Sequence, residues 1–132
     1  MSEGEVLLRK LQVRAGAKLL LIGAPDHITT VLRHGGANLV RPGEAYEAAL
    51  AFCGSPADVA RHAPVVLKGL PEDGLLWFAY RKGAAAKVSG LSRDVGWEPL
   101  ARAGYRGVRA IAFDEDWSGL RFRELSRVKA GD

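Results

Sequence analysis

The segment KLLLIGAP, Lys18 to Pro25, decides the fold class. Its apolar residues follow one another without alternation as far as Ile22, which is typical of a parallel strand covered on both faces. Gly23 then ends the strand. Pro25 fits the first turn of a helix, which we expect to run to about Arg33. A buried strand that turns directly into a helix is the opening unit of an α/β fold with a mostly parallel sheet.

The same criteria, applied outward from this segment, predict the other elements. Ser2 and Glu5 form a capping-box pattern at the start of the first helix, and Ser55-Pro56 is a good start for a later one. Pro64 should kink or split that later helix. The full set is a helix over 3–11, a short strand over 38–40, a buried strand over 46–53, a helix over 56–68, a buried strand over 75–80, a helix from Ser92 to Gly104, and strands over 108–113 and 119–125.

The end of the chain reads as an antiparallel hairpin. Only the turn 114–118 separates the last two strands, whereas a parallel crossover needs a dozen or more residues. The last strand has one wetter face, because Leu120 and Phe122 alternate with Arg121 and Arg123. We expect a single domain over 1–132, a Rossmann-like three-layer α/β sandwich with a mostly parallel sheet and a C-terminal antiparallel hairpin. The glycine- and alanine-rich segment 81–90 should be a mobile loop.

Composition favours a globular domain of the cytoplasm. The chain has 132 residues, of which 48% are hydrophobic and 26% charged, close to the globular average. No apolar run is long enough to span a bilayer, and the acidic residues in the opening MSEGEVLLRK are unlike a signal peptide. The single cysteine, Cys53, fits a reducing compartment. The scarcity of Asn and Gln suggests a thermophilic or GC-rich source.

The net charge of +4 and the pI near 9.5 invite comparison with nucleic-acid-binding proteins. However, the basic residues are dispersed and interleaved with acidic ones. A solvated surface explains this pattern more simply than a nucleic-acid interface does.

Several segments resemble class I S-adenosylmethionine-dependent methyltransferases, whose doubly wound sheet ends in an antiparallel hairpin. They are LQVRAGAKLLLIGAP (11–25), VLKGLPEDGLLWFAY (66–80) and ARAGYRGVRAIAFDEDWSGLRF (101–122). More narrowly, LIGAP (21–25), LLWFAYRKG (75–83) and DEDWSGLRF (114–122) resemble a family of small uncharacterised bacterial domains of this type. The resemblance implies a methyltransferase-like fold over nearly the whole chain. Its motifs are structural, so they identify a fold better than an activity.

The cofactor motif of that family is degenerate in this chain. The loop after the first strand has one glycine, Gly23, followed by Pro25, where the family needs a flexible glycine-rich loop. Arg41 stands at the tip of the second strand, where the family has an acid for the ribose hydroxyls, and Glu44 lies further along. The short interval before Tyr46 leaves no room for the family's third strand. The segment Cys53-Gly54-Ser55-Pro56 does not resemble a polar catalytic loop.

These departures predict a non-catalytic binding or regulatory module with no cofactor, rather than an enzyme. Its partner would be a small anionic ligand or another protein. Two alternatives stay open. One is an S-adenosylmethionine-dependent methyltransferase with an atypical cofactor loop, and the other is a basic nucleic-acid-associated domain.

Ligands of open α/β sheets bind beyond the carboxyl ends of the strands. The residues that we expect at this crevice are Gly23, Asp26, His27, Cys53, Ser55, Arg81 and Lys82. Cys53 and His27 could form a thiol–imidazole pair oriented by Asp26, although a lone cysteine is more often simply packed. Arg81 and Lys82 could hold an anionic ligand, with help from the free N–H groups after Ser55, or could be solvated loop charges.

A second candidate surface lies on the terminal hairpin. Trp117 should cover the end of the sheet, and its alternative role is a stacking platform for a base or a partner. Arg121 and Arg123 could contact a partner, although nearby acids can neutralise them. We predict no metal site, because the spacing of the histidines matches no metal-binding motif.

Overall fold

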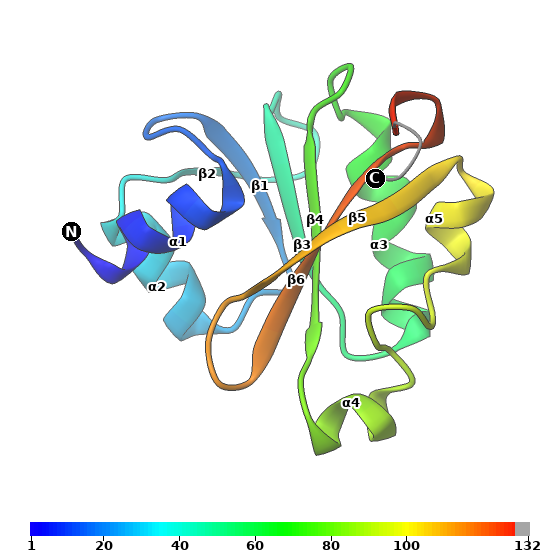
Figure 1. Cartoon of the computed structure of the whole chain (residues 1–132). Coiled ribbons are helices and arrows are strands. Elements are labelled where there is room, and N and C mark those ends of the chain that lie inside the picture. The colour runs from blue at the N-terminus through cyan, green and yellow to red at the C-terminus, as the bar shows by residue number, and fades with distance from the viewer. Residues whose placement is uncertain (129–132) are drawn as a thin grey trace.

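The computed structural model describes residues 1–128, which form a six-stranded sheet between two layers of helices (Figure 1). Helices α1 and α2 cover one face of the sheet, and α3 and α5 cover the other. The elements are α1 (Glu3–Leu11), β1 (Lys18–Ile22), α2 (Asp26–His34), β2 (Asn38–Val40), β3 (Ala48–Phe52), α3 (Pro56–Lys68), β4 (Leu75–Arg81), α4 (Ala84–Ser89), α5 (Glu98–Arg102), β5 (Tyr105–Ala112), β6 (Trp117–Glu124) and the 3₁₀ turn η1 (Leu125–Arg127).

The strand order is β2-β1-β3-β4-β6-β5, and the first four strands are parallel. Strand β6 runs antiparallel to both β4 and β5. The second strand of the C-terminal hairpin therefore lies next to β4, and the first strand, β5, lies at the edge of the sheet. The predicted class, a mostly parallel α/β sandwich that ends in an antiparallel hairpin, is confirmed.

Continuous apolar strands fill both sides of the sheet. Every residue of β3 is buried, and the side chains of β4 alternate between the two faces. Trp77 packs in the cluster beneath α1 and α2, where its indole N–H donates to the carbonyl oxygen of Leu11 at 3.0 Å. Phe78 packs in the cluster beneath α3 and α5. Helices on both faces are therefore required by the sequence of the central strands.

Two helix starts follow the predicted capping patterns. Ser2 and Glu5 make the reciprocal hydrogen bonds of a capping box at 3.1 Å each. The hydroxyl of Ser55 accepts from the N–H of Asp58 at 3.3 Å. Pro64 lies inside α3, but the helix continues through it to Lys68 and is not split.

Residues 41–47 connect two parallel strands without a helix, which is shorter than a parallel crossover normally allows. The connection is possible because β2 ends after three residues, level with Leu20 of β1. Tyr46 fixes the end of the connection to α3. Its hydroxyl donates to the carbonyl oxygen of Val66 at 2.7 Å and accepts from the N–H of Gly69 at 3.1 Å. The strand that the resemblance places beyond β2 is absent, so β2 forms the edge of the sheet.

One predicted loop and the starts of three predicted elements were wrong. The expected loop 81–90 contains the short helix α4. Ser92 does not start a long helix, because Gly96 adopts a φ of +99° and the helix begins only after Trp97. Both hairpin strands begin earlier than predicted, at Tyr105 and Trp117.

Candidate functional site

A pocket of about 390 Å³ lies at the carboxyl ends of β1 and β2, where α/β sheets bind ligands. Its apolar walls come from Leu21, Leu39 and Val40. The remaining lining residues are Gly23, Ala24, Thr29, Arg33 and Arg41. Of the crevice residues predicted from sequence, Gly23 lines this pocket. Arg41, which stands where the resemblance puts the ribose-binding acid, lines it too.

Gly23 is required by the geometry of the loop after β1. Its φ is +69°, a conformation that favours glycine. A Cβ at this position would also lie 3.0 Å from the carbonyl oxygen of Phe52 and 3.5 Å from Nε2 of His62. The loop is therefore packed closely against the end of β3 and against α3.

Helix α2 supplies the second wall of the pocket. Pro25 is its N-cap residue, and the hydroxyl of Thr29 donates to the Pro25 carbonyl oxygen at 3.3 Å. Arg33 lies one turn further along, and its guanidinium has no hydrogen-bond or ion-pair partner within residues 1–128. This cation is available to a ligand.

Arg41 follows β2 directly, and its side chain also lacks an intramolecular partner in the described chain. The nearest acid in sequence, Glu44, turns back so that its Oε1 accepts from the Arg41 N–H at 3.0 Å. Glu44 lines a different pocket, on the α3 side of the 41–47 connection. Two guanidinium groups and no carboxylate therefore line the carboxyl-edge pocket.

This set of residues does not fit S-adenosylmethionine, the cofactor implied by the fold. That molecule carries a sulfonium and an ammonium cation against one carboxylate, so Arg33 and Arg41 would repel its net charge. The ribose hydroxyls would also find no acidic acceptor at the tip of β2. The pocket is electrostatically suited to an anion.

Cys53 and His27, the candidate thiol–imidazole pair, are not brought into a reactive arrangement. Cys53 is completely buried, and this burial, with the charge of Asp58 adding to it, raises the pKa of its thiol to about 12. His27 is exposed instead, with Nε2 lying 3.4 Å from Oδ2 of Asp114 in the hairpin turn. No hydrogen bond joins His27 to Cys53 in the described structure. Asp26 is exposed in the first turn of α2.

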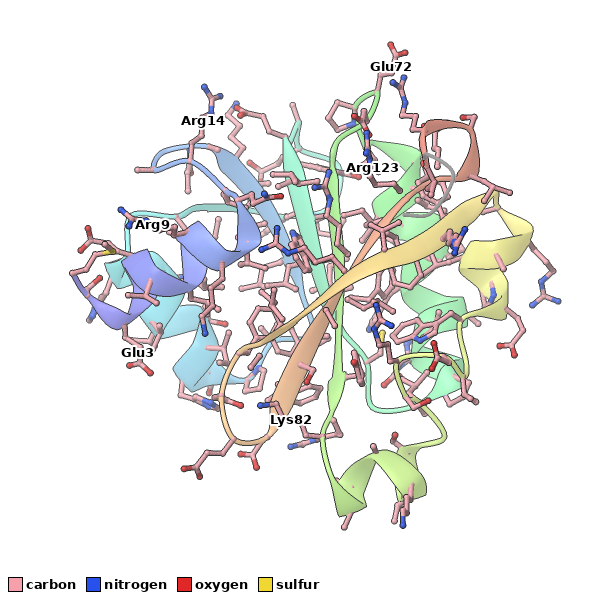
Figure 2. The ribbon with its side chains drawn as sticks, in the orientation of Figure 1. Glu3, Arg9, Arg14, Glu72, Lys82 and Arg123 are labelled. Atoms are coloured by element: carbon pink, nitrogen blue, oxygen red, sulfur yellow. The ribbon has the colours of Figure 1, made fainter. Side chains whose placement is uncertain are left out.

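Trp117 and Arg81 stabilise the end of the sheet. The indole of Trp117 is 6% exposed and packs edge-on against Phe52, with 5.0 Å between ring centroids. The guanidinium carbon of Arg81 lies 4.2 Å from the centroid of the Trp117 ring. Lys82 follows, and its backbone N–H donates to the backbone carbonyl oxygen of Asp116 at 3.0 Å. Figure 2 shows Lys82 at this edge and Glu72 at the opposite end of the sheet.

The start of α3 is occupied by the chain's own acid. Asp58 accepts from the N–H of Gly54 at 2.8 Å through Oδ2, and its Oδ1 pairs with Arg61. The N–H of Asp58 is itself donated to the Ser55 hydroxyl, so a ligand anion at this helix start would meet both an acid and an N–H that already has a partner. This group was not predicted from sequence, although the spacing of Asp58, Arg61 and His62 on one helix is a signal that could have indicated it. Burial lowers the pKa of His62, against the opposing charge of Asp58.

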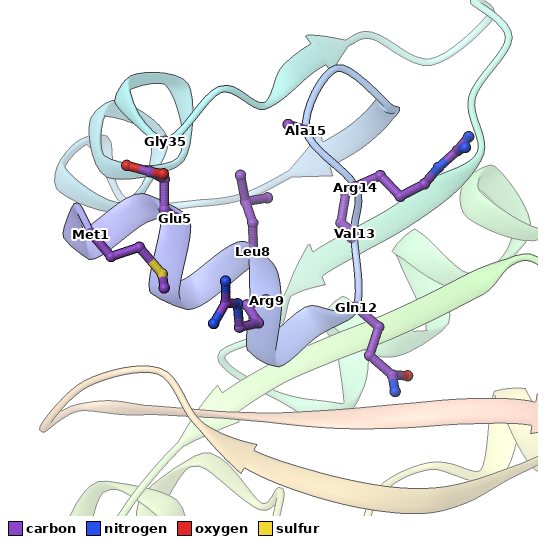
Figure 3. Close-up of a pocket in the computed structure, with 9 residues that line it drawn as sticks. All are labelled: Met1, Glu5, Leu8, Arg9, Gln12, Val13, Arg14, Ala15 and Gly35. Carbon is purple, nitrogen blue, oxygen red and sulfur yellow. The ribbon is translucent and has the colours of Figure 1, made fainter.

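A hollow of about 360 Å³ beside α1 is a weaker candidate (Figure 3). Most of its polar side chains already have partners. Glu5 belongs to the capping box, and Arg14 pairs with Glu47. Gln12 points toward the terminal hairpin, where its Oε1 accepts from Arg121 at 3.0 Å.

Membrane-spanning helices and metal-binding clusters are both absent from residues 1–128. No helix in this part of the chain is both long and apolar enough to cross a bilayer. No three His, Cys, Asp or Glu residues in it are grouped so that they could hold a metal ion.

The chain is similar in structure to methyltransferases. N-methyltransferase NodS from Bradyrhizobium japonicum superposes with a TM-score of 0.56 at 15% identity, over 92% of this chain and 94% of NodS. A TehB-like S-adenosylmethionine-dependent methyltransferase from Corynebacterium glutamicum gives a TM-score of 0.55 at 11% identity, over 94% and 88%. Fibrillarin from Aeropyrum pernix, solved with natively bound S-adenosyl-L-methionine, gives 0.53 at 13% identity, over 90% and 73%.

No protein-family model and no curated sequence matches the chain. At these identities the structural matches show a methyltransferase-type fold, and the activity must be argued from the site.

Proposed function

We propose that this domain binds a small anionic ligand with an apolar part in the carboxyl-edge pocket. The observation that carries the proposal is the pair of unpartnered arginines, Arg33 and Arg41, beside apolar walls at the place where this fold holds its nucleoside cofactor. Each guanidinium offers several N–H donors in a fixed fork, which suits a phosphate or carboxylate. The lining of the pocket is mostly polar, and the smaller apolar part from Leu21, Leu39 and Val40 suits one face of a planar ring.

Adenosine monophosphate is a suitable probe, because it combines a dianion with an apolar base. We expect calorimetry to detect its binding, and uncharged adenosine to bind more weakly. Arg41→Gln should weaken the binding of adenosine monophosphate about tenfold, since a hydrogen bond to a charged group contributes roughly 1.5–3 kcal/mol. Arg102→Gln removes the same charge from exposed α5 and is the matched control.

The same measurements can contradict the proposal. If adenosine monophosphate and adenosine bind alike, or if Arg41→Gln and Arg102→Gln have the same effect, the two arginines do not form an anion site.

The second candidate is an S-adenosylmethionine-dependent methyltransferase with an atypical loop. The structural comparisons support this candidate over a module without catalysis, because the matched proteins include methyltransferases and a fibrillarin with bound S-adenosyl-L-methionine. The two arginines of the pocket favour an anionic ligand over S-adenosylmethionine. We give them more weight, since one fold supports many functions and the local chemistry selects among them.

The same calorimeter separates the two candidates. We expect no appreciable binding of S-adenosylmethionine. A ligand present at 100 times its dissociation constant should raise the free energy of unfolding by roughly 2.7 kcal/mol, so a thermal-shift measurement gives an independent readout. Micromolar affinity for S-adenosylmethionine would place the methyltransferase first.

A further inference from the structure

Four arginines face one another across the terminal hairpin. In the register of β5 and β6, Arg106 is opposite Arg123, and Arg109 is opposite Arg121. Side chains at directly opposite positions lie on the same face of a sheet, and like charges there are destabilising. Arg121 and Arg123 lie on the face that also carries α1 and Asp73, and Arg109 is opposite Arg121.

The arginines of this cluster differ in the partners that they have within the described chain. Arg123 makes a two-pronged pair with Asp73, in which Nε and Nη2 lie 3.2 and 2.9 Å from the carboxylate oxygens. Arg121 donates from Nη1 to the neutral amide of Gln12 at 3.0 Å. The Nε of Arg121 is buried and has no hydrogen-bond partner within residues 1–128. Burial lowers the pKa of Arg121, and the like charges of Arg123 and Arg109 lower it further.

Three of the four arginines line a hollow on the hairpin. This hollow of about 240 Å³ is lined by Arg109, Arg121 and Arg123, with Val108 and Val128 beside them. A bulge between Gly107 and Arg109 interrupts the ladder at this point. Bulges of this kind re-aim a side chain and are common beside binding sites. The hollow exceeds the roughly 30 Å³ that one water molecule occupies in the liquid, so a polyatomic anion can enter it.

We propose that this hollow is a second anion site, which binds a phosphoryl-type dianion between Arg109 and Arg121, with Arg123 at its rim. A dianion here would lie between the guanidinium groups of Arg109 and Arg121 and would offset the repulsion of that cross-strand pair. Arginine suits such a ligand, because its planar fork matches tetrahedral oxyanions. Figure 2 shows Arg123 on the hairpin, at the opposite end of the view from Lys82.

The test uses pyrophosphate as the probe and Arg109→Gln as the variant. Arg109 is exposed and has no intramolecular partner in the described chain, so its removal should leave the fold intact. We expect two effects of opposite sign. Without pyrophosphate the thermal midpoint of the variant should rise, because a repulsive charge is gone. Its affinity for pyrophosphate, measured by calorimetry at constant ionic strength, should fall about tenfold.

Three controls separate the site from general charge effects. Arg102→Gln lowers the net charge equally and should leave pyrophosphate binding unchanged. Arg41→Gln should also leave it unchanged, which distinguishes this site from the carboxyl-edge pocket. Arg109→Lys keeps the charge and should retain part of the affinity. Absence of pyrophosphate binding, or equal weakening by Arg109→Gln and Arg102→Gln, would overturn the proposal.

Discussion

At the scale of single residues, burial decides which side chains of the carboxyl edge can react. Cys53 is fully buried, and its thiol pKa is raised to about 12, so it stays protonated in neutral solution. We expect iodoacetamide at pH 8 to label the native protein at least about a hundredfold more slowly than the protein in denaturant, because labelling requires opening of the core. Mass spectrometry gives both rates. Equal rates would show an accessible thiol.

The same shift predicts a dependence of stability on pH. The ordinary pKa of the thiol is 9.0 and the folded value is about 12. Below pH 9 both states hold the proton, and Cys53 adds no dependence. Between these values the unfolded state releases the proton while the folded state keeps it, so the free energy of unfolding falls as pH rises. In Cys53→Ala this fall, measured by urea unfolding, should be smaller.

Trp117 is the second residue whose role can be measured directly. Its ring is packed against Phe52 and beneath Arg81, and truncation of a buried aromatic costs roughly 3–5 kcal/mol. Small domains have about 5–15 kcal/mol in all, so Trp117→Ala should lower the thermal midpoint markedly. Val88→Ala, at a side chain that is 91% exposed, is the control and should change little. An unchanged midpoint in Trp117→Ala would contradict the packing.

At the scale of elements, α3 illustrates how a helix start is stabilised. Ser55 accepts from the N–H of Asp58, and Asp58 in turn accepts from the N–H of Gly54. Loss of an N-cap side chain typically costs roughly 0.5–2 kcal/mol. We expect Ser55→Ala to lower the free energy of unfolding in urea by about that amount. Ser126→Ala, at an exposed position in η1, should have no effect, and a similar loss in both variants would argue against a specific cap.

Elements with local signals could be predicted from the sequence, and those decided by distant contacts could not. The bounds of β1 follow from an uninterrupted apolar run, and the start of α3 follows from Ser55-Pro56. The start of α5 was predicted at Ser92, six residues too early. The indole of Trp97 folds back to donate to the Ser92 carbonyl oxygen at 2.7 Å. Ser92 therefore belongs to an irregular segment before the helix. No local pattern reveals that contact.

Some residues of the candidate site could likewise be predicted from the sequence, and others could not. Gly23 was predicted as a site residue, because it directly follows a strand. The place of Arg41 after β2 was also predicted, but only as the loss of the family's acid and not as a ligand-binding side chain. Thr29 and Arg33 were not predicted, since their exposure depends on the direction that α2 faces and on the strand missing beyond β2. The partnering of Asp58 with Gly54 likewise depends on the folded start of α3.

At the scale of the whole molecule, part of the positive charge is paired with acidic side chains of the same chain. Arg14, Arg61, Arg123 and Arg127 all pair with acids in the chain. We expect no binding of a labelled single-stranded or duplex oligonucleotide at physiological ionic strength, measured by fluorescence anisotropy. Binding through phosphate contacts would weaken steeply with salt. Salt-sensitive binding that Arg109→Gln abolishes would show that the hairpin arginines recognise a nucleic-acid backbone.

The open ends of the sheet bear on how the protein behaves at high concentration. Bare strand edges can template pairing between molecules and lead to aggregation. Here β2 exposes only three residues and is followed by Arg41 and Pro42, so it offers a short edge flanked by a charge. The longer edge, β5, is interrupted by its bulge and carries Arg106 and Arg109. Two copies that approached edge to edge along β5 would bring these charges together, and the repulsion would favour separate molecules.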